Sequence, residues 1–518
     1  MNGRILRSIA ASAALAFVLG ACGQKPGVHV DGGTGGPLAQ GGAATDPGAT
    51  EDALVDDGLT DDGFVADDGS GGEVAAPDDT GGGSSDTGGS TSSGGTTSGG
   101  TTSGGDTSGG SDGGGDTSGG TGGGGADDGG GGSDSGGKRP VTGSDRTGLT
   151  ADKMVFASHA PVTGAAPLPT TSFEKSGDLY WRNITEVQKK TVLGRNKIEL
   201  LFRDDKYDPN SARQVCRELA SKAFTVAGGG GTDQIQACGQ FAKVAEFPYF
   251  SAGVTEAGLR DNPWYFAASM SYNQQGPLLA QMVKKNFPGK KVAAIITDTP
   301  NFDDARDGWE AGVQAQGLDY YKTLRHPKGD TSWYNAYAAD LAEAGVEVLY
   351  ILSSPVDYIR FAQQATQSSI KFQYVGVGVS MGLNAVLASG CDDVDGGMFF
   401  SPFPGIDFAR KNVPEFFETA KRFNAPADDI AFALWGTAAV QHDLLQRYEK
   451  TYGPDLTRED FRDLVETQTG VGGEIFPTAN YSPENHFGST AVHLLKADCS
   501  KNGGNGEYVT VASFAKSF

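Results

Sequence analysis

The sequence is poor in the residues that commonly bind metals. Its 518 residues include six histidines and five cysteines, and no two cysteines form a Cys-x-x-Cys pair. Zinc sites need such ligands close together, so we expect neither a metal site nor a cofactor. The apolar run at residues 9–19 also falls short of the roughly 20 residues that a membrane-spanning helix requires. A permanent transmembrane span is therefore not expected there.

This short apolar run has the features of a lipoprotein export signal. Arg4 and Arg7 precede it, and Leu19-Gly20-Ala21-Cys22 closes it. Basic residues, a short apolar stretch and a small-residue cleavage site are typical of exported precursors. We predict that residues 1–21 are a signal peptide and that Cys22 is lipidated. The protein would then lie in the cell envelope, outside the cytoplasm, and be anchored to a membrane.

Positive charge is absent from residues 31–137, which contain 20 acidic residues and 40 of the chain's 79 glycines. A segment of this composition cannot bury a core. We predict that residues 22–146 form a disordered tether, with a wall-binding or glycosylated stalk as the alternative.

From Lys138 on, the chain has 44 acidic and 38 basic residues, a net charge of −6. An exported domain of this charge without a basic cluster is not expected to bind nucleic acid.

The remaining residues, 147–518, alternate between strand-like and helix-like segments. Roughly 370 residues are more than one core usually supports, so two lobes are expected. Alternation on this spacing predicts an α/β fold of parallel sheets flanked by helices, with ligands at the carboxyl ends of the strands. The predicted strands lie at 154–157, 198–202, 224–227, 249–251, 292–296, 320–323, 346–352 and 374–377, and the predicted helices at 211–222, 234–246, 277–286, 305–316 and 358–366.

Four cysteines remain after Cys22, an even number for an exported chain. Two disulfides are therefore expected, and three pairings are possible. In a sheet of strand order 2-1-3-4-5, the second and third crossover helices lie side by side on one face. Those helices carry Cys216 and Cys238. Cys391 would then pair with Cys499, provided that the C-terminal segment returns to the second lobe.

Several segments, in order and spacing, resemble the type I substrate-binding proteins of ABC importers, the leucine/isoleucine/valine-binding family. They are Pro161-Val162-Thr163-Gly164, Asp204-Asp205-Lys206-Tyr207-Asp208-Pro209, Phe247-Pro248-Tyr249-Phe250-Ser251-Ala252-Gly253-Val254-Thr255 and Tyr481-Ser482-Pro483-Glu484-Asn485-His486-Phe487-Gly488. The resemblance spans 147–518.

The resemblance implies two lobes with a ligand cleft between them. Lobe 1 would cover about 147–270 and 402–480, and lobe 2 about 271–401 and 481–518. A monomer of this kind closes around one small polar molecule, such as an amino acid, an amide or a small carboxylate, and presents it to an ABC permease. A ligand sensor that signals to a receptor is the alternative.

A glycine-rich loop is the first candidate ligand site. Residues 227–231 follow a predicted strand and lead into Thr232 and Asp233 at the start of a predicted helix. Free backbone N–H groups at a helix N-terminus suit a carboxylate or another anion. A tight turn with Thr232 or Asp233 as the helix cap is the alternative.

The resemblance adds contacts from both lobes. In lobe 1, Ser251, Gly253 and Thr255 fall on the loop that binds ligand through main-chain atoms and a threonine hydroxyl, although Thr255 could instead cap a short turn. In lobe 2, an aromatic contact is expected at Phe302. Further contacts are expected after another strand, where serines also commonly form turns. Those residues are Ser353, Ser354 and Asp357.

Residues 376–380 lack the acid with which amino-acid binders of this family pair the ligand's ammonium. An unpaired, desolvated ammonium costs several kcal/mol. Asp357 or Asp233 could replace the missing acid. Otherwise, amides, carboxylic acids and other small polar metabolites are favoured as ligands.

The segment Gly378-Val379-Ser380-Met381-Gly382 fits the Gly-x-Ser-x-Gly pattern of a hydrolase nucleophile elbow. Acids at 392, 393 and 395 and then His442 or His486 follow in the order Ser, Asp, His. However, no His-Gly-Gly oxyanion segment is present, and the strand series is that of a two-lobed binder. We therefore expect Ser380 to be a cleft hydroxyl or a turn residue, and the protein not to be an enzyme.

Overall fold

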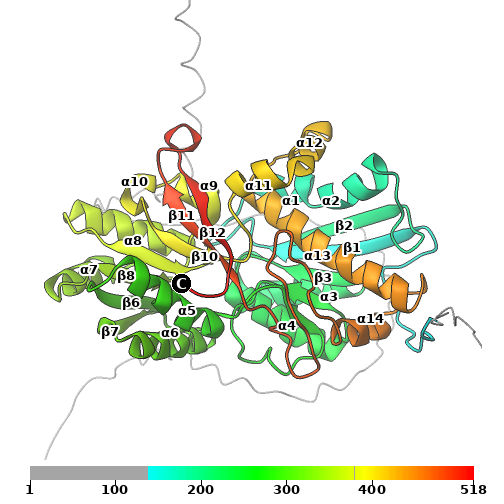
Figure 1. The fold of residues 1–518 in the computed structure, drawn as a ribbon, viewed down its shortest axis with the longest axis horizontal. Helices are drawn as coiled ribbons and strands as arrows, with labels where there is room; N and C mark the ends of the chain where they lie inside the picture. Colours follow the sequence, from blue (N-terminus) through cyan, green and yellow to red (C-terminus); the bar gives the residue numbers. More distant parts are fainter. Residues whose placement is uncertain (1–137, 379) are drawn as a thin grey trace, which may run out of the picture. The chain divides into compact units, whose positions relative to one another are not determined.

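The computed structural model of the protein describes residues 138–378 and 380–518. The predicted signal peptide, the lipidation site at Cys22 and most of the predicted tether lie outside these residues. The described chain forms two sheets, each flanked by helices (Figure 1). Over this part of the chain, no helix combines the length and the apolar character needed to cross a membrane.

The first sheet has five parallel strands in the order β2-β1-β3-β4-β5. They are β1 (Lys153–Ala160), β2 (Lys197–Asp204), β3 (Thr225–Gly228), β4 (Tyr249–Ser251) and β5 (Tyr265–Ala267). Its helices are α1 (Thr170–Ser176), α2 (Leu179–Arg182), α3 (Pro209–Ala220), α4 (Thr232–Ala245), α12 (Pro414–Arg422), α13 (Asp429–Thr451) and α14 (Arg458–Val465).

Side chains of β1 alternate between two buried layers, because successive side chains of a strand point to opposite faces. Val155 and Ala157 lie in the apolar cluster that includes side chains of α3 and α4. Met154 and Phe156 lie in the cluster that includes side chains of α2 and α13. The sheet is thus covered on both faces, as parallel sheets generally are.

The second sheet has seven strands in the order β12-β11-β10-β9-β8-β6-β7, antiparallel only between β10, β11 and β12. They are β6 (Lys291–Thr297), β7 (Asp319–His326), β8 (Val348–Leu352), β9 (Gln373–Val377), β10 (Met398–Ser401), β11 (Val492–Asp498) and β12 (Glu507–Ala515). Its helices are α5 (Tyr272–Asn286), α6 (Asp303–Gln316), α7 (Tyr334–Glu343), α8 (Pro355–Gln367), α9 (Leu383–Leu387) and α10 (Cys391–Val394).

The predicted α/β class with parallel sheets and two lobes is confirmed. We call the part built on the first sheet lobe 1 and the part built on the second sheet lobe 2. The chain passes between them three times. Residues 268–271 join β5 to α5, residues 402–405 join β10 to α11 (Ile406–Asn412), and residues 466–491 join α14 to β11.

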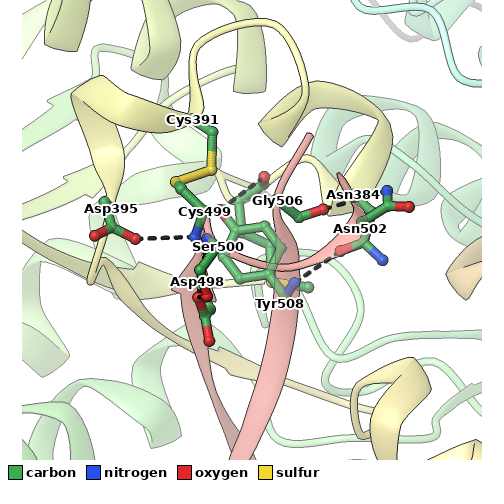
Figure 2. The surroundings of a disulfide bond; sticks show 10 residues. Asn384, Cys391, Asp395, Asp498, Cys499, Ser500, Asn502, Gly506 and Tyr508 are labelled. Atoms are coloured by element: carbon green, nitrogen blue, oxygen red, sulfur yellow. Dashed lines mark hydrogen bonds between the residues drawn. A yellow bond between two sulfur atoms is a disulfide. The ribbon is translucent and has the colours of Figure 1, made fainter. Parts of the chain in front are cut away.

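Both predicted disulfide pairings are confirmed. Cys216 on α3 is bonded to Cys238 on α4, and Cys391 is bonded to Cys499. Figure 2 shows the second bond, between the start of α10 and the turn after β11. In the same view the backbone N–H of Cys499 donates to the Asp395 carboxylate over 3.0 Å. This bond fastens the C-terminal strands of lobe 2 to the helices that follow β9.

The predicted tether boundary at residue 146 lies too far along the chain. The backbone N–H of Gly143 donates to the Asp460 carboxylate on α14 over 2.8 Å. Asp145 forms an ion pair of 2.9 Å with the buried Arg458, whose guanidinium also donates to the Phe224 carbonyl. These contacts hold residues 142–146 against lobe 1, because α14 presents both an acid and a base to them. Composition alone could not reveal this long-range pairing.

Candidate functional site

The two lobes enclose a cavity of about 240 Å³ at the carboxyl ends of β1, β3 and β4, which we call the apolar cavity. Lobe 1 lines it with these strand ends and with α13, and lobe 2 with the start of α5 and residues around 378–383. Apolar side chains form most of its wall, among them Leu168, Phe173, Phe250, Ile430, Leu434 and Phe476. Its described lining residues include no Asp and no Glu.

Glycine is required where the chain runs from β3 into α4. A Cβ atom on Gly228 would lie 1.8 Å from Tyr249 Oη, and one on Gly231 would lie 1.8 Å from Gln234 Oε1. Gly230 has a φ of +88°, a conformation that other residues rarely adopt. The loop therefore approaches its neighbours with bare backbone. The N-terminus of α4 therefore lies at the cavity. Its first backbone amides have no hydrogen-bond partner within the helix.

Two residues that line the apolar cavity carry buried hydroxyls for which no hydrogen bond is found in the described chain. Ser158 on β1 and Thr232 at the start of α4 line it, and they are 5% and 3% exposed. Neither Ser158 Oγ nor Thr232 Oγ1 has a hydrogen-bond partner in the described chain. By contrast, Thr437 Oγ1, also in the wall, donates to the Ala433 carbonyl over 3.0 Å. A buried polar group costs free energy unless it is bonded, so these two hydroxyls are the candidates in this wall for a hydrogen bond to a ligand.

A buried hydrogen-bond chain lies beneath the glycine loop. His159 lines the apolar cavity, with its Nδ1 2.7 Å from the Asp205 carboxylate and its Nε2 2.8 Å from Tyr249 Oη. Desolvation raises the pKa of Tyr249 well above its ordinary value, which keeps the phenol neutral. His159 also lies near Cys216 and Cys238. Those sulfurs are bonded to each other and both ring nitrogens are engaged, so this group offers no free metal ligand.

Ser251 and Gly253, both predicted, line the same cavity after β4. Ser251 Oγ donates to the Ala252 carbonyl over 2.8 Å. The Gly253 N–H donates to Ser269 Oγ over 2.8 Å, and a Cβ at this glycine would lie 2.3 Å from the Ser269 carbonyl oxygen. The crossover at residues 268–271 therefore packs directly on this loop, which explains why the loop has a glycine at that position.

A second cavity of about 180 Å³, which we call the polar cavity, contains most of the predicted lobe 2 contacts. Its wall combines hydroxyl, carboxylate and cationic groups with the apolar side chains of Ala165, Phe302 and Val356. Thr232 lines both cavities. The other predicted residues that line the polar cavity are Asp233, Phe302, Ser353, Ser354 and Asp357.

Hydrogen bonds fix the polar side chains of this second cavity. Asp357, in the first turn of α8, accepts from Ser353 Oγ at 3.1 Å, from Ser354 Oγ at 2.7 Å and from Tyr334 Oη at 2.6 Å. Ser353 Oγ also lies 3.0 Å from Nε2 of His326, whose pKa is lowered by burial. Ser354 is the N-cap of α8, as its position after a strand suggests.

Polar contacts join the two lobes around the cavities. Asp233 on α4 accepts from Lys328 Nζ and Asn301 Nδ2 of lobe 2. On the other side of the apolar cavity, the Asn384 N–H at α9 donates to the Asp429 carboxylate of α13 over 2.7 Å. These bonds hold the lobes against each other in this structure.

Two predicted site residues line neither cavity. Thr255 is fully buried; its hydroxyl donates to Asp304 over 3.2 Å and accepts from the Ala257 N–H over 3.0 Å. Its position fits the turn-capping alternative. Ser380 is also fully buried, and its Oγ donates to the Ser353 carbonyl and accepts from the Ser353 N–H. Ser380 was expected to be either a cleft hydroxyl or a turn residue, and its position fits a turn residue.

The hydrolase alternative has no support in the geometry. Ser380 Oγ bonds only to the backbone of Ser353 in the described chain. Nδ1 of His442 lies 2.8 Å from Tyr180 Oη, and His486 lies between the Asn262 carbonyl and Glu466. Burial lowers the pKa of His442 to about 4. Each histidine is thus engaged elsewhere.

Sequence reasoning missed the cavity contacts of Ser158, Tyr272 and α13. Ser158 opens the Ser-His-Ala-Pro-Val-Thr-Gly segment at a strand end, so the rule that placed the other loops could have selected it. Residues on α13 such as Ile430 and Leu434 gave no such signal, because an apolar helix face has the same pattern whether it packs on a sheet or borders a cavity.

Two alanine variants test the glycine loop. We expect Gly228→Ala to lower both the melting temperature and the affinity for ligand, because its Cβ would overlap Tyr249 Oη. Gly229→Ala is the matched control: its Cβ would have no neighbour closer than 3.9 Å. Thermal melting and ligand titration of both proteins check this. Equal behaviour of the two variants would contradict a tightly packed loop.

Comparisons with known proteins find a matching family model and solved structures of similar fold. A family model described as periplasmic binding protein matches residues 158–505. No similar sequence is found among curated proteins. Among solved structures, a fatty acid ABC transporter substrate-binding protein from Thermomonospora curvata is similar, with 18% identity and a TM-score of 0.61 over 72% of this chain and 95% of that one.

Two further structures show the same fold similarity. A solute-binding protein of an ABC transporter from Rhodopseudomonas palustris BisB5, in complex with 3,4-dihydroxybenzoic acid, is 19% identical, with a TM-score of 0.56 over 71% of this chain and 98% of that one. A leucine-binding protein from Thermotoga maritima is 16% identical, with a TM-score of 0.56 over 69% and 98%.

Proposed function

Because the chain belongs to the periplasmic binding protein family, we propose that it captures a small carboxylate with an apolar body and delivers it to an ABC importer. Proteins of this family bind solutes and are not enzymes. Capture of a small molecule outside the cytoplasm follows from the family. The class of ligand is the proposal.

The pair of unpartnered hydroxyls in an apolar wall carries this proposal. Thr232 is the first residue of α4, whose N-terminus favours negative charge, and Ser158 lines the same cavity from β1. The rest of the cavity suits an aliphatic or aromatic group. A zwitterion would leave its ammonium unpaired, since no acid is among the described lining residues. The fatty acid and dihydroxybenzoic acid named for two similar structures are ligands of the proposed kind.

Two threonine variants test where the carboxylate binds. We expect Thr232→Val to weaken binding of octanoate or benzoate by about 10- to 100-fold, the worth of a hydrogen bond to a charged group. Thr437→Val is the matched control, because its hydroxyl already donates to the Ala433 carbonyl. Its affinity should stay within about threefold of the parent protein.

Calorimetric titration of protein freed of copurified ligand by refolding gives these affinities. Leucine serves as the zwitterionic comparison. Tighter binding of leucine than of either carboxylate, or equal losses in the two variants, would contradict the proposed ligand class.

The remaining parts of the proposal concern delivery. Segments 268–271, 402–405 and 466–491 are the hinges about which the lobes would open. Lipidation at Cys22 and the acidic, glycine-rich tether would hold a monomeric binding domain near the permease. Export and lipid attachment can be checked by globomycin sensitivity of processing and by loss of membrane association in Cys22→Ala.

A further inference from the structure

The polar cavity has a chemistry of its own next to the apolar cavity. Tyr207, Thr232 and Asp233 of lobe 1 line it, facing Lys328 and Arg360 of lobe 2 among others. Thr232 is the single residue described as lining both cavities. The residue is 3% exposed, and no hydrogen bond is found for its buried hydroxyl in the described chain. A group bonded to this hydroxyl would therefore lie at the junction of an apolar and a polar compartment.

The acids of the polar cavity are already satisfied. Asp233 accepts from Lys328 and Asn301, so its charge is paired across the lobes. Asp357 accepts from three hydroxyl donors and lies in the first turn of α8, where the helix dipole stabilises negative charge. Both carboxylates thus have hydrogen-bond donors within the described chain, although only Asp233 has a cationic partner there.

Arg360 is the second cationic residue of this lining. Its side chain lines the polar cavity from α8, and no ion pair or hydrogen bond joins it to another residue in the described ranges. A guanidinium offers five donors in a planar fork that suits a carboxylate in two-point contact. The two acids and two cations of the lining balance in charge, but Arg360, which is exposed, is the one of the four with no hydrogen bond or ion pair in the described ranges, so a carboxylate could bind it.

From these observations we infer that the ligand is a two-part molecule: an acyl or aryl group in the apolar cavity, joined by an amide at Thr232 to a short carboxylate-bearing head in the polar cavity. An N-acylated amino acid has this form. The inference rests on the proposed function and narrows its ligand class: a parent acid has its carboxylate at Thr232, and in the conjugate an amide takes that place while the carboxylate moves to Arg360. In such a ligand, Thr232 Oγ1 donates to the amide carbonyl, and Arg360 binds the terminal carboxylate.

Matched pairs of ligands test the inference on the refolded protein. The pairs are octanoate with N-octanoylglycine and benzoate with N-benzoylglycine, titrated by calorimetry. We expect each conjugate to bind at least tenfold more tightly than its parent acid. Arg360→Gln should abolish this preference, so that the ratio of the two affinities falls to near one. Arg213→Gln, an exposed arginine on α3 outside both cavities, is the control and should keep the preference.

The outcomes separate the inference from the proposed function. Equal or weaker binding of the conjugates, with the parent acids still bound, would overturn the two-part ligand and leave the carboxylate proposal standing. A preference that persists in Arg360→Gln would overturn the placement of the head in the polar cavity. If neither parent acids nor conjugates bind, the proposed ligand class and the inference both fail.

Discussion

Replacing Cys391 and Cys499 by serine is expected to lower the free energy of unfolding of lobe 2 by about 4.7 kcal/mol, the chain-entropy value for a loop of about 100 residues. The bond spans 108 residues and joins α10 to the turn after β11. Without the bond, the unfolded chain has a higher conformational entropy, which stabilises the unfolded state. Urea unfolding followed by circular dichroism measures the change.

The second disulfide is the matched control for this prediction. Cys216 and Cys238 are 22 residues apart, so their replacement by serine should cost less, about 3 kcal/mol. Cys216 and Cys238 are fully buried, whereas Cys499 is only partly buried, so burial adds to the cost of the short-loop variant. A larger loss from the short loop than from the long one would show that packing, and not loop closure, sets the contribution of these bonds.

Replacing Asp429 by asparagine is expected to raise the free energy of unfolding at pH 7.5 by at most about 3 kcal/mol, the equivalent of the pKa difference between the two states, less the cost of one lost hydrogen bond. Desolvation raises the pKa of this fully buried carboxyl from its ordinary 3.8 to about 6. The Asn384 and Ile430 N–H groups donate to Oδ2 and Oδ1 of the carboxylate, respectively, so asparagine, with a single oxygen, can keep one of these two bonds.

The sign of the pH dependence follows from that raised pKa. Between about pH 4 and pH 6 the native state holds a proton on Asp429 that the unfolded state has lost, so the native state becomes less stable as pH rises. Above about pH 6 the penalty is complete and constant. The advantage of Asp429→Asn should therefore appear through this window and vanish below about pH 4.

Unfolding midpoints at several pH values check this expectation. Asp319→Asn changes an exposed acid at the start of β7 and should stay within about 0.5 kcal/mol of the parent protein. A loss of stability in Asp429→Asn at pH 7.5, or a gain that is the same at every pH, would contradict it.

The local pattern of the sequence was sufficient for the elements and the class of fold. Runs such as 154–157 and 292–296 are continuous apolar segments because strands of a parallel sheet are buried on both faces. The strand order of lobe 1 then placed Cys216 beside Cys238, since both crossover helices lie on the same face of the sheet. These properties depend on short-range periodicity and on general rules of chain connection.

The ligand site was only partly predictable. The glycine loop, Thr232, Ser251 and Gly253 follow strands whose carboxyl ends meet at the cleft, so their place in the apolar cavity follows from topology. The same rule selected Thr255 and Ser380, which line neither cavity. A rule about strand ends gives the edge of the sheet where a residue lies, but not the direction of its side chain.

The sequence by itself determined the alternating elements, the sheet type, the two disulfides and the glycine loop, because each depends on residue spacing and backbone freedom. Only the tertiary structure decided that the predicted contacts divide between an apolar and a polar cavity with Thr232 at their junction. It also decided that α13 closes the apolar wall and that residues 142–146 pack on α14. Such features arise where segments hundreds of residues apart exclude water together, and no local pattern records which side chains meet there.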